Sequence, residues 1–267
     1  MELDVNFVRA QFPAFEAEET KDWAFFENAG GSYVPATVID RLQQFFVEHK
    51  VQPYSFSGLS RKAGEEMDES YAAIAQLLNA REDEITIGPS TTLNFYVLAQ
   101  SLRHLLKVGD EIIVTNQDHE ANIGCWRRLS EHGIIIREWR VGKADAELDL
   151  NDLEGLINEK TKIVSCTLCS NLVATFNDMK SITEMAHRVG ALVVADGVSY
   201  APHVILFMSL NVATRLEQSV QHTIFVFSLI NASRSFRSNS ASALPTRHSR
   251  IIMPCSESLL QQPILAS

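Results

Sequence analysis

Residues 191–203 read ALVVADGVSYAPH, and this stretch decides the fold. The apolar run Ala191–Ala195 is typical of a strand buried on both faces of a parallel sheet. The run ends abruptly at Asp196, which a glycine follows. Ligands of open α/β sheets bind at the carboxyl ends of the strands, so Asp196 is a candidate ligand contact. An acid in this place is equally typical of a turn or a helix N-cap, and the rest of the chain has to decide between these interpretations.

The same alternation of strand, loop and helix occupies most of the chain before this stretch. Apolar runs predict strands at residues 84–88, 111–115, 133–139 and 161–168. Apolar residues at helical spacing predict helices at residues 93–106, 123–132, 149–157 and 179–189. This order implies right-handed βαβ units and a mostly parallel sheet with flanking helices, an α/β fold.

The first third of the chain predicts two more helices and a glycine turn. Residues 24–26 form a short apolar segment, expected to be a strand, which runs into a turn at Gly30 and Gly31. Apolar residues then recur at helical spacing over residues 36–51 and 60–80, and each segment is expected to bury one face.

Polar side chains follow four of the predicted strands. They are Ser90, His119, Asn171 and Asp196. The carboxyl ends of parallel strands share one edge of a sheet, so we expect these groups to form a single site. Ser90 lies in a hydroxyl-rich loop at a helix N-terminus, where free N–H groups and the helix dipole can hold a phosphate. Ser and Thr are also ordinary N-caps, and the loop alone is weakly specific.

Composition limits the partners of the chain. The 267 residues are 46% hydrophobic and 21% charged, with a formal net charge of −10. Nucleic acids and anionic membranes attract clustered Lys and Arg, so we expect neither as a partner and favour small-molecule ligands. The beginning of the chain resembles no secretion signal, and no apolar run approaches the roughly 20 residues of a membrane helix.

The cysteines indicate a reducing compartment. Cys125, Cys166, Cys169 and Cys255 are too few and too irregularly spaced for a disulfide framework, which favours a cytoplasmic protein. The pair Cys166 and Cys169 has the spacing of a redox or zinc motif. It lies within a strand-like run and has no second pair, so we interpret it as structural and expect no metal.

The composition changes after His203. Residues 204–267 contain no Gly, no Asp and no Lys, and the last lysine of the chain is Lys180. Turns of an α/β domain need glycine and aspartate, so the tail is not expected to continue the domain. The predicted organisation is a domain over residues 1–203 and a divergent tail over residues 204–267.

Several ordered motifs carry a resemblance to a known family. They are Phe26-Glu-Asn-Ala-Gly-Gly, Gly88-Pro-Ser-Thr-Thr, Asp118-His-Glu-Ala-Asn with Trp126, Ser170-Asn171, and Ala195-Asp-Gly with Pro202-His203. Together they resemble the class V aminotransferase and cysteine desulfurase-like family of pyridoxal phosphate enzymes, over roughly residues 20–203. The resemblance implies the large domain of the fold type I transferases, with the C-terminal small domain missing, and homodimers in intact relatives.

The resemblance also implies a role for each strand end. Ser90 and Thr91 would hold the phosphate of pyridoxal 5'-phosphate at the helix N-terminus. His119 would stack on the pyridine ring, and Asn171 would donate to the phenolic oxygen. Asp196 would pair with the pyridinium nitrogen and keep it protonated, so that the ring can act as an electron sink.

Two positions depart from the family pattern. Ser199 stands where relatives carry a longer Gln or His that reaches the phenolic oxygen, so that contact is lost or bridged by water. The strand-like segment 223–231 resembles the one that ends in Ser-x-x-Lys, with Ser228 matching the serine and Asn231 at the place of the lysine. An amide cannot form a Schiff base, so the catalytic lysine is absent there.

These features leave two hypotheses of different classes. The family implies a transferase or carbon–sulfur lyase that acts on a small amino acid through an imine. The missing lysine favours a catalytically inactive, truncated or mis-spliced product, or a non-catalytic cofactor-binding protein. Lys160, Lys162 and Lys180 belong to other elements and are not expected to replace it. A nucleotide-dependent dehydrogenase is disfavoured because no G-x-G-x-x-G follows a strand.

Overall fold

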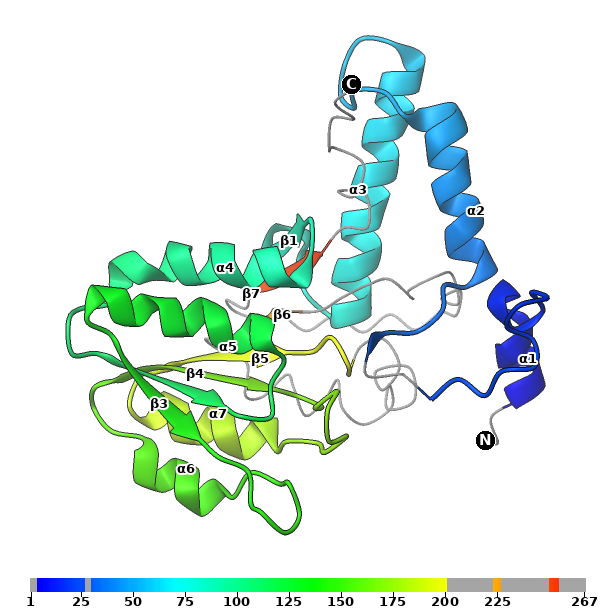
Figure 1. The fold of residues 1–267 in the computed structure, drawn as a ribbon. Helices are drawn as coiled ribbons and strands as arrows, with labels where there is room; N and C mark the ends of the chain where they lie inside the picture. The colour runs from blue at the N-terminus through cyan, green and yellow to red at the C-terminus, as the bar shows by residue number, and fades with distance from the viewer. Residues whose placement is uncertain (1–3, 27–29, 201–222, 227–249, 255–267) are drawn as a thin grey trace, which may run out of the picture. The chain divides into compact units, whose positions relative to one another are not determined.

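The computed structural model describes residues 4–26, 30–200, 223–226 and 250–254. The chain divides into two compact units, with the boundary between Ile74 and Ala75. The first unit holds the described residues up to Ile74, and the second holds the sheet and the helices around it. Figure 1 shows the elements of both.

The first unit is helical. Asp4 caps α1 (Val5–Ala10) by accepting a hydrogen bond from the Phe7 amide at 3.0 Å. The predicted helix at residues 36–51 is present as α2 (Ala36–Gln44), which continues into a π-helical turn at Phe45–His49. The predicted helix at residues 60–80 is α3 (Gly58–Leu78), which ends in the second unit.

The strand expected at residues 24–26 does not form. Residues 23–26 are irregular, and Phe26 is 90% exposed. A strand needs a neighbour to satisfy its backbone groups, and none of the described strands lies beside this segment. The prediction was wrong because an apolar triplet by itself does not supply that neighbour.

A buried histidine links α2 to α3 in the first unit. His49 is 1% exposed, and its Nδ1 lies 3.0 Å from Oε2 of Glu66 on α3. Nη2 of Arg41 on α2 lies 3.1 Å from the same oxygen. The Glu66 carboxylate therefore joins Arg41 on α2 and His49 in the π-helical turn to one position on α3.

The second unit is built on a parallel sheet, as predicted. Its described strands are β1 (Ile85–Gly88), β2 (Glu111–Thr115), β3 (Ile135–Trp139), β4 (Thr161–Thr167), β5 (Leu192–Asp196), β6 (Thr223–Val226) and β7 (Arg250–Pro254). They follow the order β1-β7-β6-β5-β4-β2-β3, and every pairing is parallel. All the carboxyl ends therefore lie at one edge.

Helices cover both faces of this sheet. They are α4 (Thr91–Leu102), α5 (Glu120–Arg127), α6 (Leu150–Leu156) and α7 (Met179–Arg188). Helices α4 and α5 pack together on one face, and α6 and α7 lie on the other (Figure 1). In the described part of the chain, no helix is long and apolar enough to cross a bilayer.

The core lies between the α4–α5 pair and the central strands. Phe95 on α4, Trp126 on α5 and Ile112 on β2 are fully buried there. The Trp126 Nε1–H donates to the Asn122 Oδ1 at 3.2 Å and to the Ser165 Oγ at 3.0 Å. The one polar atom of this large ring is thereby satisfied inside the core, as burial requires.

Two segments of the tail take part in the sheet. Strand β6 lies within the predicted strand-like segment 223–231, whereas β7 was not expected. Both stand between β5 and β1. The lack of Gly and Asp in the tail argues only against tight turns. A strand needs backbone groups to pair and favours β-branched residues, and the segment Arg-Ile-Ile-Met-Pro supplies both. Ser228 and Asn231 lie outside the described residues.

Replacement of Phe95 tests the α4–α5 layer. We expect Phe95→Ala to lower the free energy of unfolding by about 3–5 kcal/mol, because it removes a buried ring and leaves a cavity. Val97 on the same helix is 56% exposed, so Val97→Ala should change it by no more than about 0.5 kcal/mol. Urea unfolding followed by circular dichroism measures both, and equal effects would contradict the described packing.

Candidate functional site

The turn between β1 and α4 exposes a helix N-terminus. Ser90 is the N-cap of α4, and its Oγ accepts a hydrogen bond from the Leu93 amide at 3.2 Å. Thr91 is the first residue of the helix and is half-buried. A Cβ at Gly88 would overlap the side-chain amide of Asn94, so a larger residue at the end of β1 requires this buried side chain to move. Free backbone amides at such a helix end can bind an anion.

The loop between β2 and α5 presents His119. Gln117 and Asp118 in this loop are buried, whereas His119 is exposed and is the N-cap of α5. The His119 Nδ1 accepts a hydrogen bond from the Ala121 amide at 3.1 Å. Because Nδ1 acts as an acceptor, a neutral ring carries its proton on Nε2. The cap therefore fixes both the direction and the tautomer of the imidazole.

Asp196 ends β5 with a buried carboxyl group. It is 4% exposed, and its Oδ1 accepts a hydrogen bond from the Val198 amide at 2.9 Å. Among the described residues, this is the one hydrogen bond seen for the Asp196 side chain. Burial raises the pKa of Asp196 to about 6, and the Val198 amide and the charge of His119 lower it in part. The influence of His119 on this pKa places the two groups within electrostatic reach.

Asn171 and Ser199 lie in the turns that follow β4 and β5. Asn171 is half-buried in a turn closed by the hydrogen bond from the Ala174 amide to the Ser170 carbonyl, 2.9 Å long. Ser199 is half-buried in a turn in which the Tyr200 amide donates to the Gly197 carbonyl at 3.0 Å. Both turns are at the same edge of the sheet as His119 and Asp196.

The sheet order brings some of the predicted site residues together and separates others. Strands β2, β4 and β5 are neighbours, so His119, Asn171 and Asp196 follow adjacent strands. Ser90 and Thr91 follow β1, which stands three strand positions from β5, roughly 14 Å away. The sheet thus brings together the residues predicted to contact the cofactor ring. The residues predicted to bind the phosphate lie farther along the same edge.

Asp118 is a second buried acid at this edge. It is 3% exposed, and its Oδ2 accepts a hydrogen bond from the Thr115 Oγ1 at 2.8 Å. Burial, with a smaller contribution from the charge of Asp196, raises the pKa of Asp118 to about 8, against the opposing effect of the hydrogen bond from Thr115. Sequence analysis gave Asp118 no role of its own. Its position directly before His119, at the end of a predicted strand, could have marked it as a candidate site residue.

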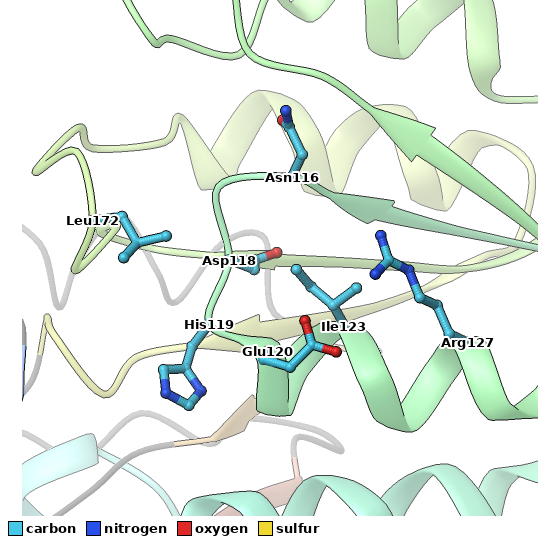
Figure 2. Close-up of a pocket in the computed structure, with 7 residues that line it drawn as sticks. All are labelled: Asn116, Asp118, His119, Glu120, Ile123, Arg127 and Leu172. Carbon is cyan, nitrogen blue, oxygen red and sulfur yellow. The ribbon is translucent and has the colours of Figure 1, made fainter.

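An open cleft of about 480 Å³ borders this loop. It is lined by Asn116, Asp118, His119, Glu120, Ile123, Arg127 and Leu172 (Figure 2). The His119 ring lies on the opposite side of the loop from Asn116. Asp196 does not line the cleft, so the cleft overlaps the predicted site only at His119.

The cysteines of the described chain are buried free thiols. Burial raises the pKa of the Cys125 thiol to about 12 and raises that of Cys166 well above its usual value. Such thiols stay protonated at neutral pH and are poor nucleophiles. No cluster of His, Cys, Asp and Glu suited to a metal ion occurs among the described residues. Cys255 lies outside them.

Comparison with known proteins identifies the family. Residues 24–210 match the family model described as Aminotransferase class-V, and the chain belongs to this family. An aminotransferase-like protein of Gibberella zeae, FGM3, is 40% identical over 208 residues, which are 75% of this chain and 50% of that protein. A cysteine desulfurase of Serratia proteamaculans is 33% identical over 76% of this chain and 51% of its own length. The chain thus spans about half the length of these relatives.

Solved structures confirm the fold. The cysteine desulfurase CsdA of Escherichia coli matches with a TM-score of 0.64 and 25% identity, over 79% of this chain and 52% of that chain. The cysteine desulfurase of Thermococcus onnurineus NA1 matches with a TM-score of 0.66 and 24% identity, over 74% of this chain and 48% of that chain. The resemblance seen in the sequence motifs is confirmed, and the fold is that of the type I pyridoxal phosphate enzymes.

The high pKa of Asp118 predicts a specific pH dependence. The folded state holds the Asp118 proton more tightly than the unfolded state, so stability falls as the pH rises from the unfolded pKa towards about 8. Between pH 6 and 8 this group alone should cost about 2 kcal/mol, since each pKa unit corresponds to about 1.4 kcal/mol. We expect Asp118→Asn to remove this fall, measured by urea unfolding across the range.

Asp178→Asn is the matched control. The Ser181 hydroxyl, which donates to the Asp178 Oδ2 at 2.7 Å, lowers the pKa of Asp178. The Asp178 carboxyl group is therefore ionised throughout pH 6–8. Its replacement should leave the pH dependence of the free energy of unfolding unchanged. A fall of stability with pH that is as steep in Asp118→Asn as in the wild type would show that Asp118 does not titrate in this range.

Proposed function

We propose that this chain provides a binding site for pyridoxal 5'-phosphate of the class V aminotransferase type, and that it holds the cofactor without a Schiff-base lysine. The observation that carries the proposal is the buried Asp196 carboxyl group at the end of β5, within electrostatic reach of His119. A buried carboxylate with one hydrogen bond from the described chain is suited to a cationic ring nitrogen. A mutant C-DES structure with glycine covalently linked to its PLP cofactor shares the fold, with a TM-score of 0.61.

Each residue of the site has a task in this proposal. Asp196 binds the ring nitrogen and keeps it protonated. His119 lies against the face of the ring. Asn171 donates to the phenolic oxygen, and Ser199 is too short to add a direct contact there. Ser90 and Thr91 bind the phosphate at the N-terminus of α4. When bound in a complete enzyme, the cofactor supplies an electron sink.

The ordinary family reaction needs a lysine that this chain lacks at the expected place. No Lys follows Lys180, and Asn231 stands where the family pattern has it. Lys160 and Lys162 lie at the amino end of β4, opposite the site, and the Lys162 ammonium group donates to the Glu159 carbonyl at 2.8 Å. A site of this composition lacks the nucleophile for amino-acid turnover.

The complete enzyme activity is the second candidate function. Relatives described as an aminotransferase-like protein and a cysteine desulfurase suggest a small amino acid as its substrate. A lysine recruited from elsewhere would be needed to restore transamination or carbon–sulfur lysis. Homodimerisation, as in intact relatives, is part of this second candidate.

The remaining features support a small-molecule partner in a reducing compartment. The net charge of −10 disfavours nucleic acid and anionic membranes. Cys125, Cys166 and Cys169 are free thiols. On this ground we place the protein in the cytoplasm.

The proposal predicts that Asp196 is needed for cofactor affinity. We expect Asp196→Asn to weaken binding of pyridoxal 5'-phosphate by about 10- to 100-fold, because the amide cannot form a charge-assisted bond to a cationic nitrogen. Asp110→Asn is the control, since Asp110 lies at the amino end of β2, the opposite edge of the sheet. Titration of the cofactor absorbance gives both affinities, and equal affinities would contradict the role of Asp196.

Borohydride reduction distinguishes the two candidate functions. Reduction fixes only a cofactor that is joined to a lysine as an imine. We expect peptide mass mapping to show no adduct concentrated on one lysine, and we expect amino acids to leave the cofactor spectrum unchanged. A pyridoxyl group on a single specific lysine, together with a spectral change on adding an amino acid, would establish the enzyme instead.

A further inference from the structure

A buried glutamine connects the two loops that carry His119 and Asn171. Gln117 lies two residues before His119 and is 2% exposed. Its side chain and its carbonyl bond to the turn that follows β4, between Ser170 and Asn177. We call these bonds, formed by Gln117, Ser170, Thr175 and Asn177, the Gln117 latch.

The latch uses both polar atoms of the glutamine side chain. The Gln117 Nε2 donates to the Asn177 Oδ1 at 3.1 Å, and the Gln117 Oε1 accepts from the Thr175 Oγ1 at 2.8 Å. The Ser170 Oγ donates to the Gln117 carbonyl at 2.8 Å. A buried amide with both ends paired fixes its neighbours in direction, because breaking either bond leaves a polar group unpaired away from water.

The hydrogen bonds continue from the latch to β5. The Asn177 Nδ2 donates to the Thr167 carbonyl at 2.7 Å. The Thr167 Oγ1 in turn donates to the Asp196 carbonyl at 3.2 Å. The ends of β2, β4 and β5 are thereby joined by side-chain hydrogen bonds in addition to the backbone pairing of the sheet.

Each connected loop also carries a residue of the proposed cofactor site. In the β2–α5 loop, His119 follows Gln117 after a single residue. In the turn after β4, Asn171 directly follows Ser170, whose hydroxyl is part of the latch. The two site residues thus lie on the two loops that the latch joins, and neither is one of its four residues.

We propose that Gln117 is a positioning residue that makes these two loops one rigid unit and so sets His119 relative to Asn171; its effect on the cofactor rests on the proposed function. Gln117 does not touch the cofactor. It acts through the backbone of the β2–α5 loop on one side and through Ser170, Thr175 and Asn177 on the other.

Two substitutions of Gln117 separate the latch from simple packing. Gln117→Met keeps the length of the side chain and removes both of its hydrogen bonds. Gln117→Glu keeps an acceptor for Thr175 and, when ionised, has no donor for Asn177. Asn158→Ala is the matched control: its Nδ2 donates to the Glu111 Oε2 at 2.9 Å and joins β2 to the start of β4 at the opposite edge.

Hydrogen exchange tests the connection without any cofactor. The Ala121 amide bonds to His119, and the Ala174 amide bonds to Ser170, and neither touches the Gln117 side chain. We expect both to exchange about tenfold faster in Gln117→Met, with a smaller change in Gln117→Glu at low pH, where the protonated acid regains a donor. Asn158→Ala should leave both rates unchanged. Acceleration at one amide alone would overturn the proposal.

Cofactor binding gives the second readout. We expect Gln117→Met to bind pyridoxal 5'-phosphate about tenfold more weakly than wild type and to lose the circular dichroism that a fixed ring acquires. Unchanged affinity and dichroism would refute the positioning role while leaving the proposed function intact. If the wild-type chain binds no cofactor, the proposed function fails, and hydrogen exchange alone decides the latch.

A further variant covers a failure of Gln117→Met to fold. Thr175 is half-buried, and Thr175→Val removes one bond of the latch while leaving Gln117 in place. We expect the same two amides to exchange faster, by a smaller factor. No change at either amide would count against the latch.

Discussion

The parallel backbone pairing of β4 with β2 and β5 is the constraint on which the rest of the structure depends. Strands β2 and β4 are buried along nearly their whole length, and helices cover both faces of the sheet. Within the strands there is consequently little room for groups that need water or a ligand. The polar residues collect where the strands end, and parallel pairing puts those ends at one edge.

Burial of two acids at this edge has an electrostatic cost. Asp118 and Asp196 are both almost completely buried, and each has a raised pKa, about 8 and about 6 respectively. At neutral pH the first is therefore largely protonated and the second largely ionised. The edge then carries one buried negative charge within electrostatic reach of His119, an arrangement suited to the single cationic nitrogen of the proposed ligand.

The alternation of strands and helices in the second unit could be predicted from the sequence because local patterns specify it. The apolar runs gave β2, β4 and β5 to within a residue or two, and the polar residues after them were correctly placed at one edge. Two local patterns did not predict strands correctly. Residues 24–26 have the composition of a strand but no partner strand among the described residues, whereas Arg250–Pro254, in the tail of unusual composition, pairs with β1. Pairing depends on a distant segment, which no local pattern records.

The sequence by itself determined the α/β class, the family motifs and the identity of the strand-end residues, because each depends on residues close together in the chain. The tertiary structure alone decided that β6 and β7 stand between β5 and β1, which separates Ser90 from Asp196. It also decided that Asp118 is buried within electrostatic reach of Asp196 and that Gln117 reaches Asn177, 60 residues away in the chain. Burial and hydrogen-bond partners are properties of the packed chain, since they arise only when remote segments exclude water from one another.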